Sequence, residues 1–257
     1  MESNYKKLMD DNWSFLDKYN IQVWCISLEE RNDRYRYVCN EFKKVGLYDR
    51  VNFYRPPRNP RSGREGCLIS HLVCMKEAYA HNKHALIFED DVKFTNNWGT
   101  CIEEIKLFLE KDTSWDIFRF GCVLSYFEHK SAHSEKIWKS KSYNTHAILY
   151  NTKIIKYILE KGLERTTFHL DDYLHDNTEI NDYSLIEPIC YQKAGLSSDN
   201  KWFSRKFLQT LMENKYIFEI LQYINNKQVW MMRFLPTKIQ NKLSIWSFLV
   251  YFGTNWL

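Results

Sequence analysis

The stretch "HALIFEDDVKF", residues 84–94, places four apolar residues directly before three consecutive carboxylates, Glu89, Asp90 and Asp91. The apolar run indicates a buried strand, yet burying an unpaired carboxylate is strongly unfavourable. Either the acidic run is a solvated strand end, or something positive lies against it. Side chains alternate along a strand, which would put Glu89 and Asp91 on one side and Asp90 on the other. Two carboxylates that converge in this way form a hard-oxygen site suited to Mg²⁺ or Mn²⁺.

Working outward from this stretch, apolar runs and helical periodicities alternate along the chain. Strands are expected at 21–28, 50–55, 84–89, 115–121, 146–151 and 183–192, and helices at 32–45, 65–82, from about 97, and 152–162. Gly46 is expected to end the first of these helices and Thr152 to cap the last. The alternation predicts an α/β fold with a mostly parallel central sheet and flanking helices. Ligands bind beyond the carboxyl ends of such strands, where the acidic run lies.

Composition separates two parts of the chain. We expect a catalytic domain over 1–200 and a helical, aromatic-rich extension over 201–257. The tail "LSIWSFLVYFGTNWL", 243–257, follows basic residues and is typical of a segment that lies in a membrane interface. The alternative is a terminal helix that docks onto the core. Neither a signal core nor 18 consecutive apolar residues occur, which predicts a cytoplasmic protein with at most peripheral membrane contact.

Charge and cysteine content narrow the function classes. The net charge of +4 is too small to indicate a nucleic-acid partner. The seven cysteines form no C-x-x-C pair, so free thiols in a reducing compartment are expected rather than zinc or a disulfide framework. The absence of a P-loop or a G-x-G-x-x-G motif argues against ATPases and dinucleotide enzymes.

Six motifs occur in a specific order: "ISLEERNDR", "GREGCLISHLVCMKEA", "ALIFEDDVKF", "WDIFRFG", "SYNTHAILYN" and "HLDDYL". In order and spacing they resemble glycosyltransferase family 25, which contains bacterial lipooligosaccharide glycosyltransferases and collagen hydroxylysine galactosyltransferases. The resemblance spans about residues 21–200. Two departures concern the donor sugar: Ser27 stands where asparagine is common, and Arg64 is inserted before the glycine-cysteine pair.

The resemblance implies a GT-A-type nucleotide-sugar-binding fold and a metal-dependent, inverting transfer. A hexose, galactose or glucose, would move from a UDP-sugar to a hydroxyl of an oligosaccharide or of hydroxylysine. Mn²⁺, or Mg²⁺, is the expected cofactor, with Glu89 and Asp91 as its ligands. Two alternatives stay open: a non-catalytic carbohydrate- or nucleotide-binding module on the same fold, and a metal-dependent phosphoesterase.

Six further residues are expected to bind the donor. Arginine suits forked recognition of phosphate, and the buried histidine and its neighbours could contact sugar or phosphate. The set is Arg31, Arg34, Glu65, Ser70, His71 and Asp90. For Arg34 the alternative is a solvated helix start, and for His71 it is a packing role in the core.

The motif "HLDDYL" supplies a second acidic centre, Asp171 and Asp172. An inverting transfer needs a base that takes the proton of the acceptor hydroxyl, and carboxylates serve this role in sugar chemistry. We therefore expect both aspartates to be catalytic, with helix capping as the alternative.

Overall fold

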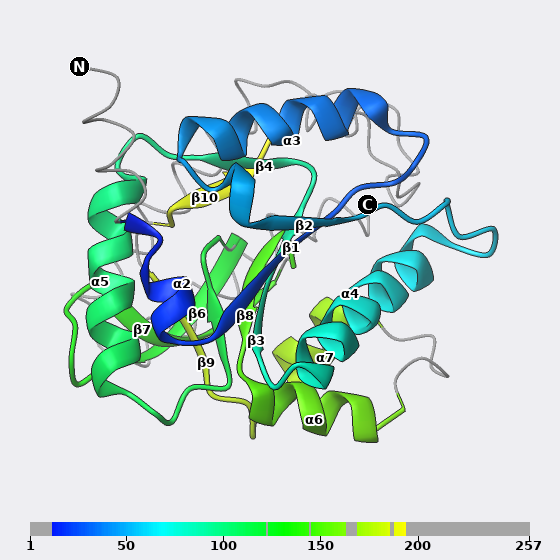
Figure 1. The fold of residues 1–257 in the computed structure, drawn as a ribbon. Helices are drawn as coiled ribbons and strands as arrows, with labels where there is room; N and C mark the ends of the chain where they lie inside the picture. Colours follow the sequence, from blue (N-terminus) through cyan, green and yellow to red (C-terminus); the bar gives the residue numbers. More distant parts are fainter. Residues whose placement is uncertain (1–11, 122, 144, 163–168, 186–187, 194–257) are drawn as a thin grey trace, which may run out of the picture.

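The computed structural model describes residues 12–121, 123–143, 145–162, 169–185 and 188–193 (Figure 1). The expected extension over 201–257, the tail at 243–257 and the domain boundary at residue 200 all lie outside these residues. Within the described part, no helix is long and apolar enough to cross a membrane.

An eight-stranded sheet forms the centre of the molecule, in the order β2-β1-β3-β8-β5-β9-β7-β6. The pairings give six of these strands one direction, while β8 and β7 run against them. The α/β fold with a mostly parallel central sheet is therefore confirmed. The bounds are Ile21–Ile26 (β1), Val51–Tyr54 (β2), His84–Glu89 (β3), Ile117–Arg119 (β5), Val123–Lys130 (β6), Ile137–Tyr143 (β7), Ala147–Tyr150 (β8) and Asp182–Leu185 (β9).

Helices cover both faces of the sheet, α2, α3 and α5 on one and α4, α6 and α7 on the other (Figure 1). On β3, Leu86 and Phe88 pack with the first group, whereas Ala85 and Ile87 pack with the second. Because strand side chains alternate, Glu89 follows Ile87 to the α4 side. The bounds are Phe15–Lys18 (α2), Asn32–Lys44 (α3), Gly63–Ala80 (α4), Trp98–Lys111 (α5), Thr152–Glu160 (α6) and Leu170–Asp176 (α7).

The helix ends follow the sequence signals closely. Gly46 and Gly162 have φ values of 71° and 62°, the left-handed conformation that commonly follows a helix, just after α3 and α6. The cap of α6 is a correction: Asn151 is the N-cap, and its side chain accepts a hydrogen bond from the backbone N–H of Lys153. Thr152 is the first helical residue instead.

The single strand expected at 183–192 is wrong, because this segment contributes to two sheets. β9 lies in the central sheet, whereas β10 (Cys190–Gln192) pairs antiparallel with β4 (Val92–Phe94) in a separate two-stranded sheet. Pro188, which has no N–H to donate to a strand ladder, lies between them. β4 starts directly after Asp91, so the chain passes from one sheet to the other at Asp90 and Asp91.

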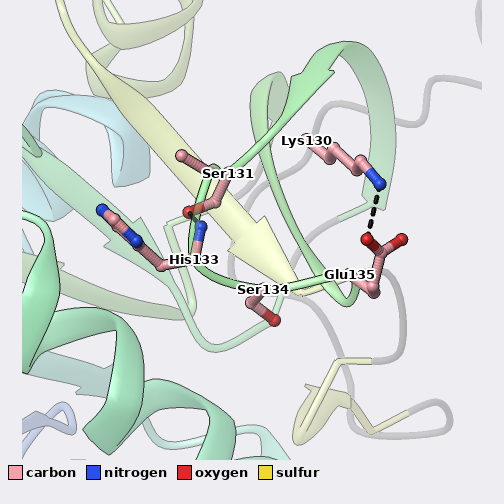
Figure 2. Close-up of a pocket in the computed structure, with 6 residues that line it drawn as sticks. Lys130, Ser131, His133, Ser134 and Glu135 are labelled. Atoms are coloured by element: carbon pink, nitrogen blue, oxygen red, sulfur yellow. Dashed lines mark hydrogen bonds and ion pairs between the residues drawn. The ribbon is translucent and has the colours of Figure 1, made fainter.

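The hairpin of β6 and β7 was not expected from the sequence. Its turn surrounds a hollow of about 440 Å³ lined by residues 130–135 (Figure 2). Lys130 and Glu135 close one side of it with an ion pair of 2.5 Å. The hairpin is at the edge of the sheet, with β9, β5 and β8 between it and β3, so this hollow is remote from the acidic run.

Candidate active site

Arg34 is the positive partner of the acidic run. From α3 its guanidinium reaches Asp90 at 2.9 Å and Asp91 at 2.7 Å, and its side chain is 12% exposed. Both aspartates therefore face the same group. The expected alternation of Glu89, Asp90 and Asp91 is wrong at this point, because β3 ends at Glu89 and the next two residues form a turn.

Asp91 is held in an environment that disfavours its charge. Burial raises the pKa of its carboxyl group to about 7, with the neighbouring Glu89 and Asp90 adding to the effect and Arg34 opposing it. One oxygen, Oδ2, accepts the hydrogen bond from Arg34, whereas Oδ1 is buried with no hydrogen-bond partner. A buried carboxylate oxygen in this condition is available to a ligand.

Glu89 lies on the other side of the strand end, against α4 and the start of β8. The hydroxyl of Thr145 donates a hydrogen bond of 2.7 Å to Glu89 Oε1. The same oxygen lies 3.6 Å from His71 Nε2 and 3.8 Å from Cys67 Sγ. Burial raises the pKa of Glu89, but the contacts with His71 and Thr145 outweigh it and the net shift is downward, so this carboxylate is ionised.

Asp171 comes to the same place from α7. Burial raises the pKa of Asp171 to about 7, the charge of Glu89 adds to this, and Arg119 opposes it. Its Oδ1 is buried without a hydrogen-bond partner. The N-cap of α7 is His169, so capping does not account for Asp171. The structure thus brings Glu89 and Asp171, from two distant motifs, to one site around Thr145.

Asp172 is in a different environment although it is the next residue. It is exposed, and the charge that acts between it and Arg64 places the two near each other. The two aspartates expected to be catalytic are therefore unequal, and Asp171 alone of the pair has a carboxyl group with a raised pKa.

The remaining predicted donor residues make mostly local contacts. Arg31 pairs with Asp33 at 2.9 Å, and its charge also reaches Asp90. Glu65 pairs with Arg61 at 3.1 Å on the first turn of α4. The hydroxyl of Ser70 donates to the carbonyl of Gly66 within the helix. His71 differs, because its ring is completely buried and lies at the site.

Four residues of the site carried no role in the sequence interpretation: Cys67, Thr145, His146 and Arg119. Arg119 forms an ion pair of 2.8 Å with Asp182, and both side chains are fully buried. A charged residue in the middle of the apolar segment "WDIFRFG" was the available signal, since such a residue is rarely buried unless paired. The other three lie within motifs that resemble the family.

His146 packs beneath Glu89 and depends on a glycine. The backbone N–H of Glu89 donates to the carbonyl of His146 at 2.9 Å. A Cβ atom on Gly121 would lie 2.3 Å from His146 Nε2 and 2.4 Å from the carbonyl oxygen of Cys190, closer than such contacts occur. Burial lowers the pKa of His146 to about 4, so the ring is neutral near pH 7.

Comparison with known families decides the class of this site. Residues 58–170 match the sequence model of Glycosyltransferase family 25 (LPS biosynthesis protein). This region belongs to glycosyltransferase family 25. The chain is a glycosyltransferase, and its α/β fold is the GT-A-type fold that the resemblance implied. Family 25 membership implies a nucleotide-sugar donor and a glycan acceptor. The matched region includes Cys67, His71, Glu89, Asp91 and Thr145.

Three solved structures are similar to this family 25 chain at low identity. A197 from STIV shares 9% identity over 66% of this chain and 83% of that one, with a TM-score of 0.41. A glycosyltransferase involved in glycosylation of the major capsid of PBCV-1 shares 13% over 57% and 67%, with a TM-score of 0.36. Mannose-1-phosphate geranyltransferase from Thermus thermophilus shares 8% over 65% and 73%, with a TM-score of 0.40. No curated protein sequence matches the chain.

Proposed function

We propose that this glycosyltransferase moves a hexose, galactose or glucose, from a UDP-sugar to an acceptor hydroxyl with inversion at the anomeric carbon. The observation that supports this most strongly is Asp171, a buried carboxyl group with a pKa of about 7 and one oxygen without a partner. A general base works best when its pKa is near the operating pH. Asp171 is accordingly the proposed base for the acceptor hydroxyl, with Asp172 as an auxiliary group at the solvent side.

Glu89 and Arg119 set the state of this base. The negative charge of Glu89 favours the protonated form of Asp171, while the buried guanidinium of Arg119 favours the ionised form. Because the two effects oppose each other, Asp171 can both take up and release a proton near neutral pH. The hydroxyl of Thr145 donates to Glu89, which fixes the position of that carboxylate beside the base.

The donor diphosphate is proposed to bind near α3 and the turn after β3. Arg31 and Arg34 supply two guanidinium groups there, and Arg34 already contacts Asp90 and Asp91. Arginine matches phosphate geometry through paired hydrogen bonds. Glu65, Ser70 and His71 remain proposed contacts for the sugar and diphosphate.

The donor set at this turn suits a hard divalent cation, and the partnerless Oδ1 of Asp91 supports a ligand role. Mn²⁺ or Mg²⁺ is therefore proposed as the cofactor, with Asp91 and Glu89 as the expected ligands. When bound, the cation would neutralise charge on the leaving diphosphate.

UDP release tests the proposal. The full chain is incubated with UDP-galactose and UDP-glucose, with an oligosaccharide or a hydroxylysine peptide as acceptor, in Mn²⁺ or EDTA. A transferase couples UDP release to a new glycosidic bond, and the stereochemistry of that bond reports inversion. Donor binding without turnover would favour the non-catalytic module. Release of phosphate without transfer would favour the phosphoesterase.

The tail at 243–257 and the division at residue 200 complete the proposal. We propose that 1–200 is the catalytic domain and that the tail holds the enzyme at the cytoplasmic face of a membrane. Truncation after Lys242 should then abolish liposome binding and leave an active enzyme. Aggregation or loss of the thermal transition would instead assign the tail to the core.

A further inference from the structure

We propose that Cys67, His71 and Glu89 form a binding site for one borderline-soft divalent cation such as Zn²⁺, separate from the oxygen ligands of Asp91. The sulfur, nitrogen and oxygen atoms of these three side chains all lie within 4.8 Å of one another. The site does not rest on sugar transfer, because cation binding is a property of the chain without donor or acceptor.

The fold places these three ligands together for a simple reason. Cys67 and His71 are four residues apart on α4, so both side chains point from the same face of the helix. That face packs on β3, where Glu89 follows Ala85 and Ile87 toward α4. A helix and a strand, the rigid parts of the scaffold, therefore present all three ligands.

The distances suit a tetrahedral cation. Zinc binds sulfur at about 2.3 Å and nitrogen or oxygen at about 2.0–2.2 Å, which separates neighbouring ligand atoms by about 3.3–3.7 Å in a tetrahedron. Glu89 Oε1 lies 3.6 Å from His71 Nε2 and 3.8 Å from Cys67 Sγ. Only small side-chain movements separate this arrangement from a bound geometry.

The buried state of His71 is an independent sign of a missing ligand. Its side chain is fully buried and its Nε2 atom has no hydrogen-bond partner, an unfavourable condition for a polar atom. The other ring nitrogen, Nδ1, lies 3.4 Å from the hydroxyl of Tyr150. Metal-binding histidines commonly make such a contact with the second nitrogen, which orients the first toward the cation.

The surroundings of Glu89 repeat this pattern. Thr145 holds the carboxylate through a hydrogen bond of 2.7 Å, as expected for an oriented ligand. Three protein ligands leave a fourth position open, and Asp171 lies close enough for its charge to act on Cys67. A set of sulfur, imidazole and carboxylate favours Zn²⁺ or Co²⁺ over Mg²⁺, whereas Asp90 and Asp91 offer oxygen alone.

Cobalt spectroscopy on the full chain tests the site. After removal of metals with EDTA, Co²⁺ titration should give visible d–d bands and a near-ultraviolet thiolate-to-cobalt band, each saturating at one ion per chain. The thiolate band should vanish in Cys67→Ser. In His71→Gln, Zn²⁺ affinity, measured by competition with a chromophoric chelator, should fall by at least about 10–100-fold, the loss seen even for outer groups of metal sites.

Cys74→Ala provides the matched control, because Cys74 lies on the same helix but outside the cluster. It should keep the thiolate band. A readout without substitution guards against unfolded variants: Zn²⁺ should protect Cys67 of the wild-type chain from alkylation, measured by peptide mass spectrometry. The proposal is overturned if the wild-type chain shows no thiolate band, if Cys67→Ser retains it, or if Zn²⁺ leaves the alkylation of Cys67 unchanged.

Discussion

The guanidinium of Arg34 lies 2.7 Å from the carboxylate of Asp91, and it reaches the carboxylate of Asp90 with its second nitrogen. Removing one partner of a buried ion pair leaves an uncompensated charge, which costs about 3–5 kcal/mol. Arg34→Ala should therefore lower the free energy of unfolding by about that amount at pH 8, measured by urea denaturation.

The control for this substitution is Arg36→Ala on the same helix, because Arg36 is exposed and bonds only a local carbonyl in α3. Its effect should stay within about 0.5 kcal/mol, as for most surface substitutions. Adding Asp91→Asn to Arg34→Ala should recover part of the loss. Equal stability of the two arginine variants would contradict the pairing.

Asp171→Asn should retain UDP-sugar binding and reduce transfer by about 100-fold or more, the usual effect of losing a general base. The asparagine keeps the shape of the side chain but cannot accept the proton. Donor affinity is measured by calorimetry and transfer by UDP release. Asp172→Asn, at the exposed neighbouring position, should lose much less activity. Loss of donor binding in Asp171→Asn would instead make Asp171 a donor ligand.

Transfer should depend on the ionisation of Asp171. The base must be deprotonated, and its pKa is about 7, so kcat/KM should rise from pH 6 to pH 8 with its midpoint near 7. Below the midpoint the rate should fall about tenfold per pH unit. The profile is recorded for wild type and for Asp172→Asn, which should keep the midpoint. A flat profile between pH 6 and pH 8 would exclude Asp171 as the base.

The same shift makes a prediction about stability. The pKa of Asp171 is raised in the folded chain from its usual 3.8, so the folded state binds the proton more tightly than the unfolded state. The contribution of Asp171 to stability is thus present below about pH 4 and is lost as pH rises toward 7. Asparagine does not ionise, so Asp171→Asn should gain stability relative to wild type between pH 5 and pH 8.

The size of this gain is at most about 4 kcal/mol, since a tenfold change in proton affinity corresponds to about 1.4 kcal/mol. Urea denaturation at the two pH values measures it, and Asp172→Asn should show no such pH dependence. A constant difference between Asp171→Asn and wild type would show that the carboxyl group is not desolvated.

Asp91→Asn should remove the part of the activity that Mn²⁺ stimulates and leave the chain folded. The amide keeps one acceptor for Arg34 but is a weaker ligand for a hard cation than a carboxylate. The measurement is UDP release over a Mn²⁺ titration, with circular dichroism as the folding control. An unchanged Mn²⁺ activation curve would remove Asp91 from the metal site.

Much of the fold was predictable because it depends on local signals. The end of α3 at Gly46 and the periodic apolar face of α4 both follow from short patterns. The hairpin of β6 and β7 was missed because no glycine or proline marks the turn at residues 130–135. β9 and β10 were merged because a continuous apolar run does not reveal a change of sheet.

The site was predictable in its residue types and less so in its grouping. Glu89, His71 and Asp171 were all recognised, but the alternation rule paired Glu89 with Asp91 on the assumption that β3 continued. The turn at Asp90 instead directs two carboxylates to Arg34 and leaves Glu89 with Cys67. Where a strand ends is decided by its neighbours in the sheet, which the local sequence does not contain.

The hydrogen bond between Thr145 and Glu89 joins residues 56 positions apart, and β8 must pair with β3 before it can form. Contacts of this sequence separation form late, because a long loop must close before they contribute. During refolding, helix content should therefore return before the catalytic site exists. Recovery of enzymatic activity should follow the slowest kinetic phase of strand pairing, and a partly folded chain should be inactive even when most of its helices are formed.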